Sequence, residues 1–116
     1  MVAERAYALY LQGFHREAAV LFEGLTAVDP RNVYCHDALA ATYLAMGQPQ
    51  QAVVAATNAL RVEPNHADSR ARRCEAYLQL QMFAQARQDL EALRLNRAGA
   101  QYSRLQLRLQ NATALR

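Results

Sequence analysis

Apolar residues recur along most of the chain at the spacing of a helix. Within 16–28 they fall every three or four residues, which places them on one face of a helix. The same spacing returns in 50–62 and again in 99–113. No segment alternates apolar and polar residues for long enough to predict a strand. The pattern therefore predicts an all-α chain.

The chain also repeats itself with a period of 34 residues. A shift by this period superposes small residues, glycines and prolines on one another. The matching sets are Ala6, Ala40 and Cys74; Gly13 and Gly47; Ala18, Ala52 and Ala86; Pro30 and Pro64; and Tyr43 and Tyr77. Agreement at so many positions predicts one structural unit that recurs along the chain.

Each repeated position has a structural reason. The small residues would lie where two helices of a hairpin come closest. Glycine ends a first helix in the left-handed conformation, and Pro49 begins the next helix, where its missing N–H is not needed. A proline after the second helix disfavours helical geometry in the residue before it. Asn32 and Asn65 are expected to cap the helices that follow them.

The pattern of small residues, tyrosine, glycine, alanine and proline at these offsets resembles the tetratricopeptide repeat. Residues 33–66 match best, with Leu39, Ala40, Tyr43, Gly47, Ala52, Ala59 and Pro64 in place. The resemblance implies a single domain, 1–116, of about three helix-turn-helix repeats in a right-handed superhelix. The repeats would cover about 1–32, 33–66 and 67–98, followed by a capping helix over about 99–113.

The third repeat departs from the family pattern at three positions. Gln81 replaces the glycine, Ala98 replaces the proline, and Arg73 stands where the family usually buries a leucine. The capping helix is expected to cover the last apolar surface of the stack with one face, while its arginines and glutamines face water.

Composition narrows the class of protein further. Hydrophobic residues make up 53% of the chain, but none of the apolar runs reaches the roughly 20 residues that span a bilayer. We therefore expect no membrane insertion and, because the N-terminus does not resemble a signal peptide, a cytoplasmic protein. The two cysteines, Cys35 and Cys74, are expected to be free thiols.

Basic charge is unevenly distributed. All 13 basic residues are arginine; residues 1–60 hold three of them against five acids, and residues 61–116 hold ten against five. The arginine-rich half could bind nucleic acid. Arg70, Arg72 and Arg73 cannot all share one helix face, and local ion pairs with Asp68 and Glu75 explain them more simply.

We expect no enzyme activity, metal site, cofactor or small-molecule substrate. The three histidines lie on different hairpins and form no metal-binding pair. Cys35 and His36 are neighbours on a helix, so their side chains point about 100° apart and cannot readily form a nucleophile and its base. Gly13 and Gly47 are isolated, so there is no phosphate-binding loop.

The resemblance implies that the first helix of each hairpin lines a concave groove. The groove residues would be Tyr7, Tyr10, Leu11, Tyr34, Asp37, Ala41, Leu44, Asp68, Glu75 and Leu78. This set is apolar and rich in tyrosine, with an acidic edge. It predicts a protein or peptide partner that supplies an extended apolar segment with basic flanks.

Two kinds of tetratricopeptide protein can be compared with this groove. Co-chaperones that hold a C-terminal carboxylate use a clamp of Lys, Asn and Arg. The matching positions here are Ala3, Tyr7, Ala38, Asp68 and Arg72. Only Arg72 has the right chemistry, and Asp68 would repel a carboxylate, so the clamp is not predicted.

A narrower resemblance is to bacterial type III secretion chaperones. It rests on Phe22-x-x-Leu25 followed by Asp29, and on the run from Ala45 to Gln48 followed by Ala52. The resemblance implies a chaperone that holds a translocator subunit in its groove; needle-subunit chaperones are a second possibility. Such chaperones carry a further helix before the first repeat, whereas residue 1 here falls inside that repeat. A structural subunit of a larger assembly is the alternative, and a homo-oligomer is compatible with either.

Overall fold

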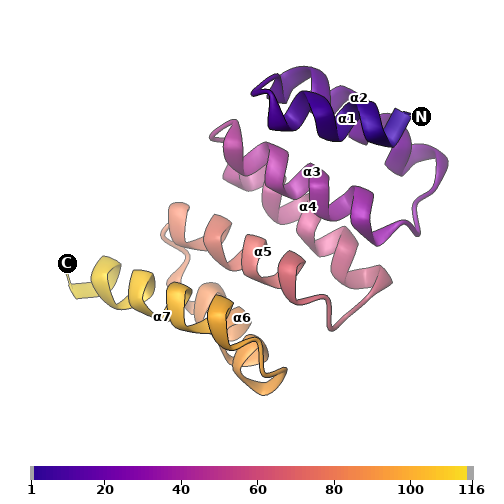
Figure 1. Cartoon of the computed structure of the whole chain (residues 1–116). Helices are drawn as coiled ribbons and strands as arrows, with labels where there is room; N and C mark the ends of the chain where they lie inside the picture. Colours follow the sequence, from indigo (N-terminus) through magenta and orange to yellow (C-terminus); the bar gives the residue numbers. More distant parts are fainter. Residues whose placement is uncertain (1, 115–116) are drawn as a thin grey trace.

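In the computed structural model, which describes residues 2–114, the chain forms seven helices and no strand (Figure 1). The helices are α1 Val2–Leu11, α2 His15–Val28, α3 Val33–Ala45, α4 Pro49–Val62, α5 Ala67–Gln79, α6 Phe83–Leu95 and α7 Gly99–Ala114. The predicted all-α class is confirmed. None of the described helices is long and apolar enough to cross a membrane.

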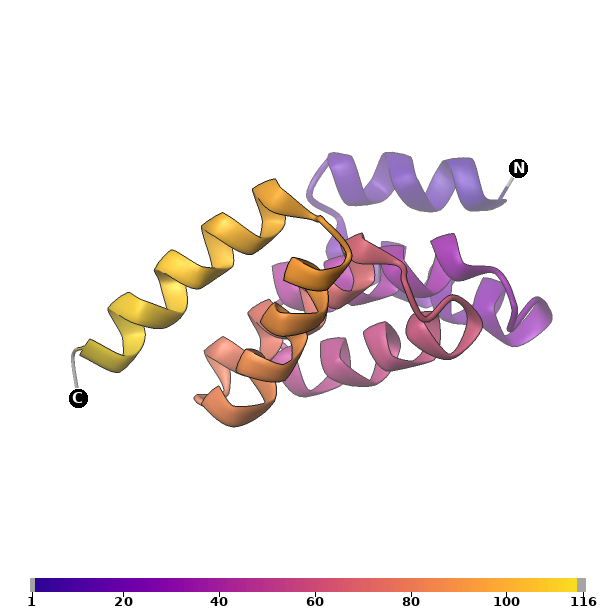
Figure 2. The ribbon, with the colours of Figure 1, turned by 90° about the horizontal axis from the view of Figure 1, so that it is seen from below.

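The helices stack as successive hairpins into an elongated body of 44 × 26 × 20 Å, with α1 and α7 toward its two ends (Figures 1 and 2). Each helix packs on the next one in sequence, and α3 also contacts both α1 and α5, while α5 contacts α7. The even-numbered helices α2, α4 and α6 do not contact one another. The odd-numbered helices are therefore drawn together, and their side of the stack is the concave one.

The turns within the hairpins follow one design. Gly13 and Gly47 have φ of 89° and 70°, as predicted for a left-handed helix end. In each case the next residue donates its N–H to a carbonyl five residues back, from Phe14 to Leu9 and from Gln48 to Tyr43. Gln81 adopts the same conformation, with φ of 60°, although it is not glycine. The third repeat therefore keeps the left-handed turn without a glycine.

The helix starts confirm one predicted cap and correct the other. The Asn32 side chain accepts hydrogen bonds from the backbone N–H groups of Tyr34 and Cys35 at 3.1 and 3.2 Å. The cap predicted at Asn65 is wrong: the N-cap residue of α5 is His66, whose ring nitrogen Nδ1 lies 3.3 Å from the backbone nitrogen of Ser69. His66 lies one period of 34 residues after Asn32 and so holds the capping position itself.

The end of α6 differs from the ends of α2 and α4. Asp29 and Glu63, which follow those two helices and precede prolines, have φ of −132° and −134°. After α6 no proline follows, and Arg97 turns into the left-handed region with φ of 58°. Ala98 then donates its N–H to the carbonyl of Leu93 at 3.0 Å. Without a proline to keep the preceding residue out of the helical region, the chain closes α6 with a tight turn.

The small repeated residues lie at the helix contacts, as predicted. Their side chains are all fully buried: Ala6, Ala40, Cys74, Ala18, Ala52 and Ala86. Larger side chains fill the rest of the core, with Phe22 and Leu39 in the N-terminal half and Leu90, Leu93 and Leu105 in the C-terminal half. Because Leu105 belongs to α7, this helix covers the last hairpin and acts as the predicted cap.

Candidate peptide-binding groove

A hollow of about 150 Å³ opens on the concave side, between α1, α3 and α5. Its lining residues are Tyr7, Tyr10 and Leu11 from α1, Asp37, Ala38 and Ala41 from α3, and Arg72 from α5. Ala38 and Ala41 are buried, and their small side chains leave the space that the tyrosines border. Leu11 is 81% exposed, so its apolar surface is free for a partner.

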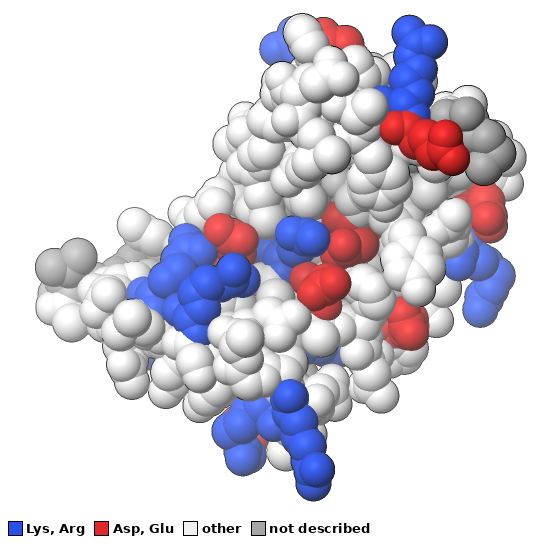
Figure 3. Space-filling model, in the orientation of Figure 1, with Lys and Arg blue, Asp and Glu red and all other residues white. Residues whose placement is uncertain are grey.

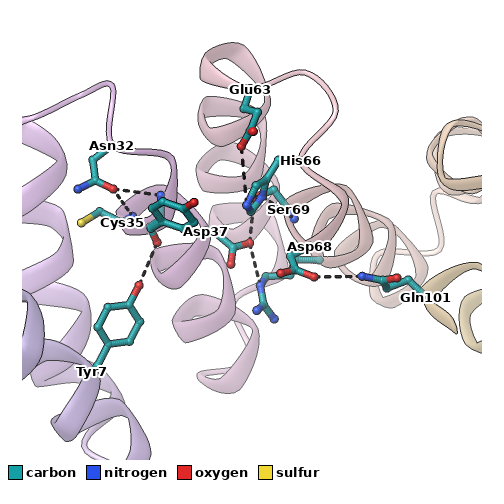
Figure 4. Close-up of polar contacts among 11 residues, drawn as sticks. Tyr7, Asn32, Cys35, Asp37, Glu63, His66, Asp68, Ser69 and Gln101 are labelled. Atoms are coloured by element: carbon teal, nitrogen blue, oxygen red, sulfur yellow. Dashed lines mark hydrogen bonds and ion pairs between the residues drawn. The ribbon is translucent and has the colours of Figure 1, made fainter. Parts of the chain in front are cut away.

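The rings of Tyr7 and Tyr10 form one wall of the hollow, and contacts with neighbouring residues fix their positions. The Tyr7 ring packs edge-on against Phe22, with 5.0 Å between ring centroids. The Tyr7 hydroxyl donates a hydrogen bond to the backbone carbonyl of Tyr34 at 3.3 Å (Figure 4). Burial raises the pKa of this hydroxyl, so Tyr7 keeps its proton and its donor role at neutral pH. The Tyr10 ring lies against His15 at 5.4 Å.

An ion pair borders the hollow on its α5 side. The Asp37 oxygen Oδ1 accepts hydrogen bonds from Arg72 Nε and from the Ser69 hydroxyl, each at 2.9 Å (Figure 4). Burial alone would lower the pKa of Arg72, but the attraction and hydrogen bond of Asp37 outweigh it and raise the pKa. Arg72 therefore presents a permanent positive charge at the edge of an otherwise apolar hollow.

Further along the groove the surface becomes polar. Asp68 accepts a hydrogen bond from Gln101 at 3.0 Å, and Glu75 accepts one from Arg108 at 2.9 Å. Both pairs join α5 to α7, and basic and acidic side chains alternate over this part of the face seen in Figure 3. The groove thus has an apolar section at α1 and α3, followed by a polar section at α5 and α7.

The predicted groove residues fall into two groups, those that line the hollow and those that lie outside it. Tyr7, Tyr10, Leu11, Asp37 and Ala41 line the hollow.

The others lie outside it. Asp68 and Glu75 belong to the polar section, and Tyr34 contributes a backbone carbonyl while its ring packs edge-on to His66. Leu44 is half-buried away from the hollow, and Leu78 is buried in the C-terminal core, so it has little surface to offer a partner. A binding role for any of these residues stays a prediction.

Two residues of the hollow were not among the predicted groove residues, Ala38 and Arg72. In the sequence both match positions of a carboxylate clamp, and Arg72 also belongs to the cluster with Arg70 and Arg73. Ala38 lies three residues before Ala41 and therefore on the same helix face, a spacing that could have identified it. Arg72 lies one period of 34 residues after Ala38, so the repeat places it at the same position of the next hairpin. Its ion pair with Asp37, on another helix, is not visible in the sequence.

The three clustered arginines point to two sides of α5. Arg72 pairs with Asp37, whereas Arg70 and Arg73 both reach Asp89 on α6, at 3.2 and 2.7 Å. The expected partners, Asp68 and Glu75, were wrong, because the arginines bridge to neighbouring helices instead of pairing along their own. The cluster therefore offers no continuous cationic surface.

Among residues 2–114, no group of three or more His, Cys, Asp or Glu side chains is placed to hold a metal ion. Ser69 lies between His66 and Asp37, in hydrogen-bond distance of both, but it is fully buried and cannot reach a substrate (Figure 4). Cys35 and Cys74 are free and buried, and burial raises the pKa of both thiols. Such thiols are poor nucleophiles.

Comparison with known families agrees with this architecture. A family model described as tetratricopeptide repeat matches residues 43–109. The chain therefore belongs to the tetratricopeptide repeat family.

Solved structures with the same fold include proteins bound to peptides. The first such domain of Spaghetti (RPAP3), bound to the HSP90 peptide SRMEEVD, is 21% identical over 97% of this chain and 90% of that one, with a TM-score of 0.89. The Yersinia enterocolitica type III secretion translocator chaperone SycD is 19% identical over 97% and 81%, with a TM-score of 0.88. PcrH, solved with the chaperone-binding region of PopD, is 20% identical over 97% and 89%, with a TM-score of 0.87. No curated protein sequence matches the chain.

Proposed function

We propose that this protein binds an extended apolar segment of a partner protein in its concave groove, as an interaction module or chaperone. The observation that carries the proposal is the hollow between α1, α3 and α5, with its alanine floor, its tyrosine wall and the exposed Leu11. A side chain of the partner can enter this space without any rearrangement of the stack.

The expected affinity follows from the size of the apolar surface. If a bound segment buries roughly 300–500 Å² of apolar area at about 25 cal/mol per Å², the gross gain is on the order of 8–12 kcal/mol. Ordering the segment and losing its translational freedom consume much of this gain. A dissociation constant in the micromolar range, about 8 kcal/mol, is therefore near the upper limit for the groove alone.

The charges of the groove favour one kind of partner. The peptide SRMEEVD in the RPAP3 structure ends in acidic residues and a carboxylate. In this chain such a ligand would meet Asp68 and Asp37 along the groove, which costs energy even with Arg72 nearby. An apolar segment with basic neighbours avoids that repulsion. The narrower proposal, that the protein is a type III secretion translocator chaperone, rests on the fold it shares with SycD and PcrH.

The groove is tested with peptides selected from a random library displayed on phage. We expect the full chain to enrich sequences with bulky apolar residues beside Lys or Arg. In fluorescence anisotropy, Leu11→Arg should raise the dissociation constant of a selected peptide by about tenfold or more, equivalent to about 1.4 kcal/mol. Leu95→Arg is the matched control, because Leu11 and Leu95 are each the last residue of a helix and are 81% and 66% exposed.

Enrichment of acidic peptides, or equal losses in the Leu11 and Leu95 variants, would contradict the groove proposal. The narrower role is tested separately, with the chaperone-binding region of PopD and the translocator YopD peptide as probes. Micromolar binding of either probe, lost in Leu11→Arg, supports a translocator chaperone. Failure of both, while library peptides bind, rejects that narrower role and leaves peptide binding in place.

A further inference from the structure

Polar groups of two hairpins meet at the start of α5. The His66 ring nitrogen Nδ1 lies 2.8 Å from the Ser69 hydroxyl oxygen and 3.3 Å from the Ser69 backbone nitrogen. The same hydroxyl lies 2.9 Å from Oδ1 of Asp37, which also receives Arg72 Nε at 2.9 Å (Figure 4). A chain of polar contacts therefore runs from the cap of α5 to Asp37 and Arg72, which both line the hollow of the groove.

These contacts cannot all be hydrogen bonds at once, because Ser69 has a single hydroxyl hydrogen and a carboxylate such as Asp37 only accepts. If Nδ1 of His66 carries no hydrogen, it accepts from the Ser69 backbone N–H, and the hydroxyl donates either to Nδ1 or to Asp37. If Nδ1 carries a hydrogen, it donates to the hydroxyl oxygen, and the hydroxyl donates to Asp37. Ser69 is fully buried, so bulk water does not supply a further partner. The hydrogen on Nδ1 thus decides where the Ser69 hydroxyl points.

Glu63 connects that hydrogen to the charge of the ring. The other ring nitrogen of His66, Nε2, lies 4.0 Å from a carboxylate oxygen of Glu63. A nitrogen lone pair facing a carboxylate is unfavourable, so Nε2 keeps its hydrogen. A second hydrogen, on Nδ1, therefore makes the ring a cation. The His66 side chain is 14% exposed, which gives solvent protons access to it, and histidine is the side chain that changes charge between about pH 5 and 8.

Other groups around the ring also act on its charge. The charged and titratable groups are Glu63 at the end of α4, Tyr34 and Asp37 on α3, Asp68 and Arg70 in the first turn of α5, and Asp89 on α6, which pairs with Arg70. Glu63 and Asp37 favour the cation, whereas Arg70 and the N-terminus of α5 oppose it. The charge of His66 is therefore determined by α3, α4 and α5 together with the pH of the solution.

We propose, on the basis of the proposed peptide binding, that His66 makes the affinity of the groove for a segment with basic flanks fall as pH falls. With the ring neutral, Arg72 is the one cation that contacts Asp37. With the ring charged, a second cation is linked to Asp37 through the Ser69 hydroxyl. The added positive charge beside the hollow repels the Lys or Arg that flanks the bound apolar residues.

The internal repeat provides a variant that caps α5 without titrating. His66 holds the position that Asn32 holds one period of 34 residues earlier, and the Asn32 side chain accepts hydrogen bonds from two backbone N–H groups. His66→Asn should therefore keep the cap while its charge stays fixed. Ser69→Ala keeps the histidine but removes the link to Asp37. Circular dichroism and Tm verify that both variants are folded.

NMR tests the link without any peptide. Nitrogen-15 shifts of the His66 ring show which nitrogen carries hydrogen, and the Arg72 Nε resonance reports on the contact with Asp37. Between about pH 7.5 and 5.5 the Arg72 resonance of the wild type should move together with the protonation of His66. In Ser69→Ala it should no longer follow the ring. An Arg72 resonance that ignores His66 in the wild type, or that follows it equally in Ser69→Ala, would overturn the proposal.

Fluorescence anisotropy then tests the effect on binding, with a histidine-free library peptide that carries Lys or Arg beside its apolar residues. For the wild type, the dissociation constant should rise about threefold or more from about pH 7.5 to 5.5. The rise should disappear in His66→Asn and for a peptide with Gln in place of its Lys and Arg. His15→Asn should retain it, because His15 packs against Tyr10 and has no contact with Asp37 among the described residues.

The possible failures are distinguishable. A wild-type affinity that does not change with pH, or an equal change in His66→Asn, overturns the role of His66 and leaves peptide binding in place. Loss of the pH dependence in His15→Asn would assign it to the ring beside Tyr10 and would also overturn the proposal. Absence of binding at every pH rejects the groove itself, and the pH-dependent affinity with it.

Discussion

Arg73 holds Asp89 through two hydrogen bonds, from Nε at 3.0 Å and from a terminal nitrogen at 2.7 Å. The pair joins α5 to α6 at a position where the family buries a leucine. Asp89 is 1% exposed and also receives Arg70 at 3.2 Å. The third repeat thus replaces apolar packing with a buried ionic network.

Removing Asp89 should be strongly destabilising. Asp89→Ala leaves two arginines without their counter-charge inside the stack, and we expect a loss of about 3–5 kcal/mol in the free energy of unfolding. Urea denaturation followed by circular dichroism measures it. Glu91→Ala on the same helix, which removes an exposed pair with Arg94, is the control and should cause no comparable loss. Similar effects of the two changes would show that the network has no structural role.

Two glycines should respond to alanine with opposite signs. An added Cβ at Gly24 or Gly47 would meet no atom of a packed neighbour within 4 Å, so space does not distinguish them. Gly24 lies within α2, where alanine should raise the free energy of unfolding by about 0.5–1 kcal/mol. Gly47 has φ of 70°, so alanine there should lower it by about 1 kcal/mol. If urea denaturation shows that both substitutions change the free energy of unfolding in the same direction, the backbone conformation does not account for their effects.

The two asparagines proposed as caps should also differ. Asn32→Ala removes the acceptor of two N–H groups at the start of α3 and should cost about 1 kcal/mol of stability. Asn65→Ala should change stability little, because His66 caps α5. Thermal unfolding of the two variants, compared at matched concentration, distinguishes them. A larger loss of stability in Asn65→Ala than in Asn32→Ala would show that Asn65 caps α5.

Alkaline pH should destabilise the fold through Cys74. Burial raises the pKa of this thiol from 9.0 to about 12, so the folded protein keeps the proton after the unfolded chain has released it. The free energy of unfolding should therefore fall as pH rises from about 9 toward 12, by at most about 1.4 kcal/mol per pH unit from this group.

Cys74→Ala is the test of that assignment. Alanine occupies the equivalent positions in the other repeats, Ala6 and Ala40, so the variant should fold. Its stability should decline less steeply than that of the wild type between about pH 8.5 and 10, below the range in which Tyr43, with a pKa raised by burial to about 12, contributes. Identical slopes for the two proteins would exclude Cys74 as the cause.

The predictions from sequence succeeded where one repeat position imposes one local requirement. A small side chain at the helix contact, a glycine at φ above zero or a proline at the first helical position can be recognised without knowing the neighbours. The predicted ion-pair partners of the arginines were wrong, because the true partners lie on other helices. Asp68 and Glu75 are near Arg72 and Arg73 in the sequence, but the acids that pair with these arginines are Asp37 and Asp89, which lie 35 and 16 residues away.

The candidate groove shows the same division. The resemblance to the repeat family placed Tyr7, Tyr10 and Leu11 in the groove, and the structure brings all three to one hollow. Leu78 has a similar place in its repeat, but α7 packs there and Leu78 joins the core.

The sequence by itself determined the helices, their pairing into hairpins and the repeat, because these depend on residues within one period of the chain. The tertiary structure alone decided the ion-pair partners of the arginines, the opening of the hollow beside Arg72 and the left-handed turn at Gln81. The Arg72–Asp37 pair and the hollow depend on how one hairpin is placed against the next, whereas the Arg73–Asp89 pair and the turn at Gln81 depend on how α5 and α6 pack within the third hairpin. None of these contacts follows from the spacing of residues along the chain alone.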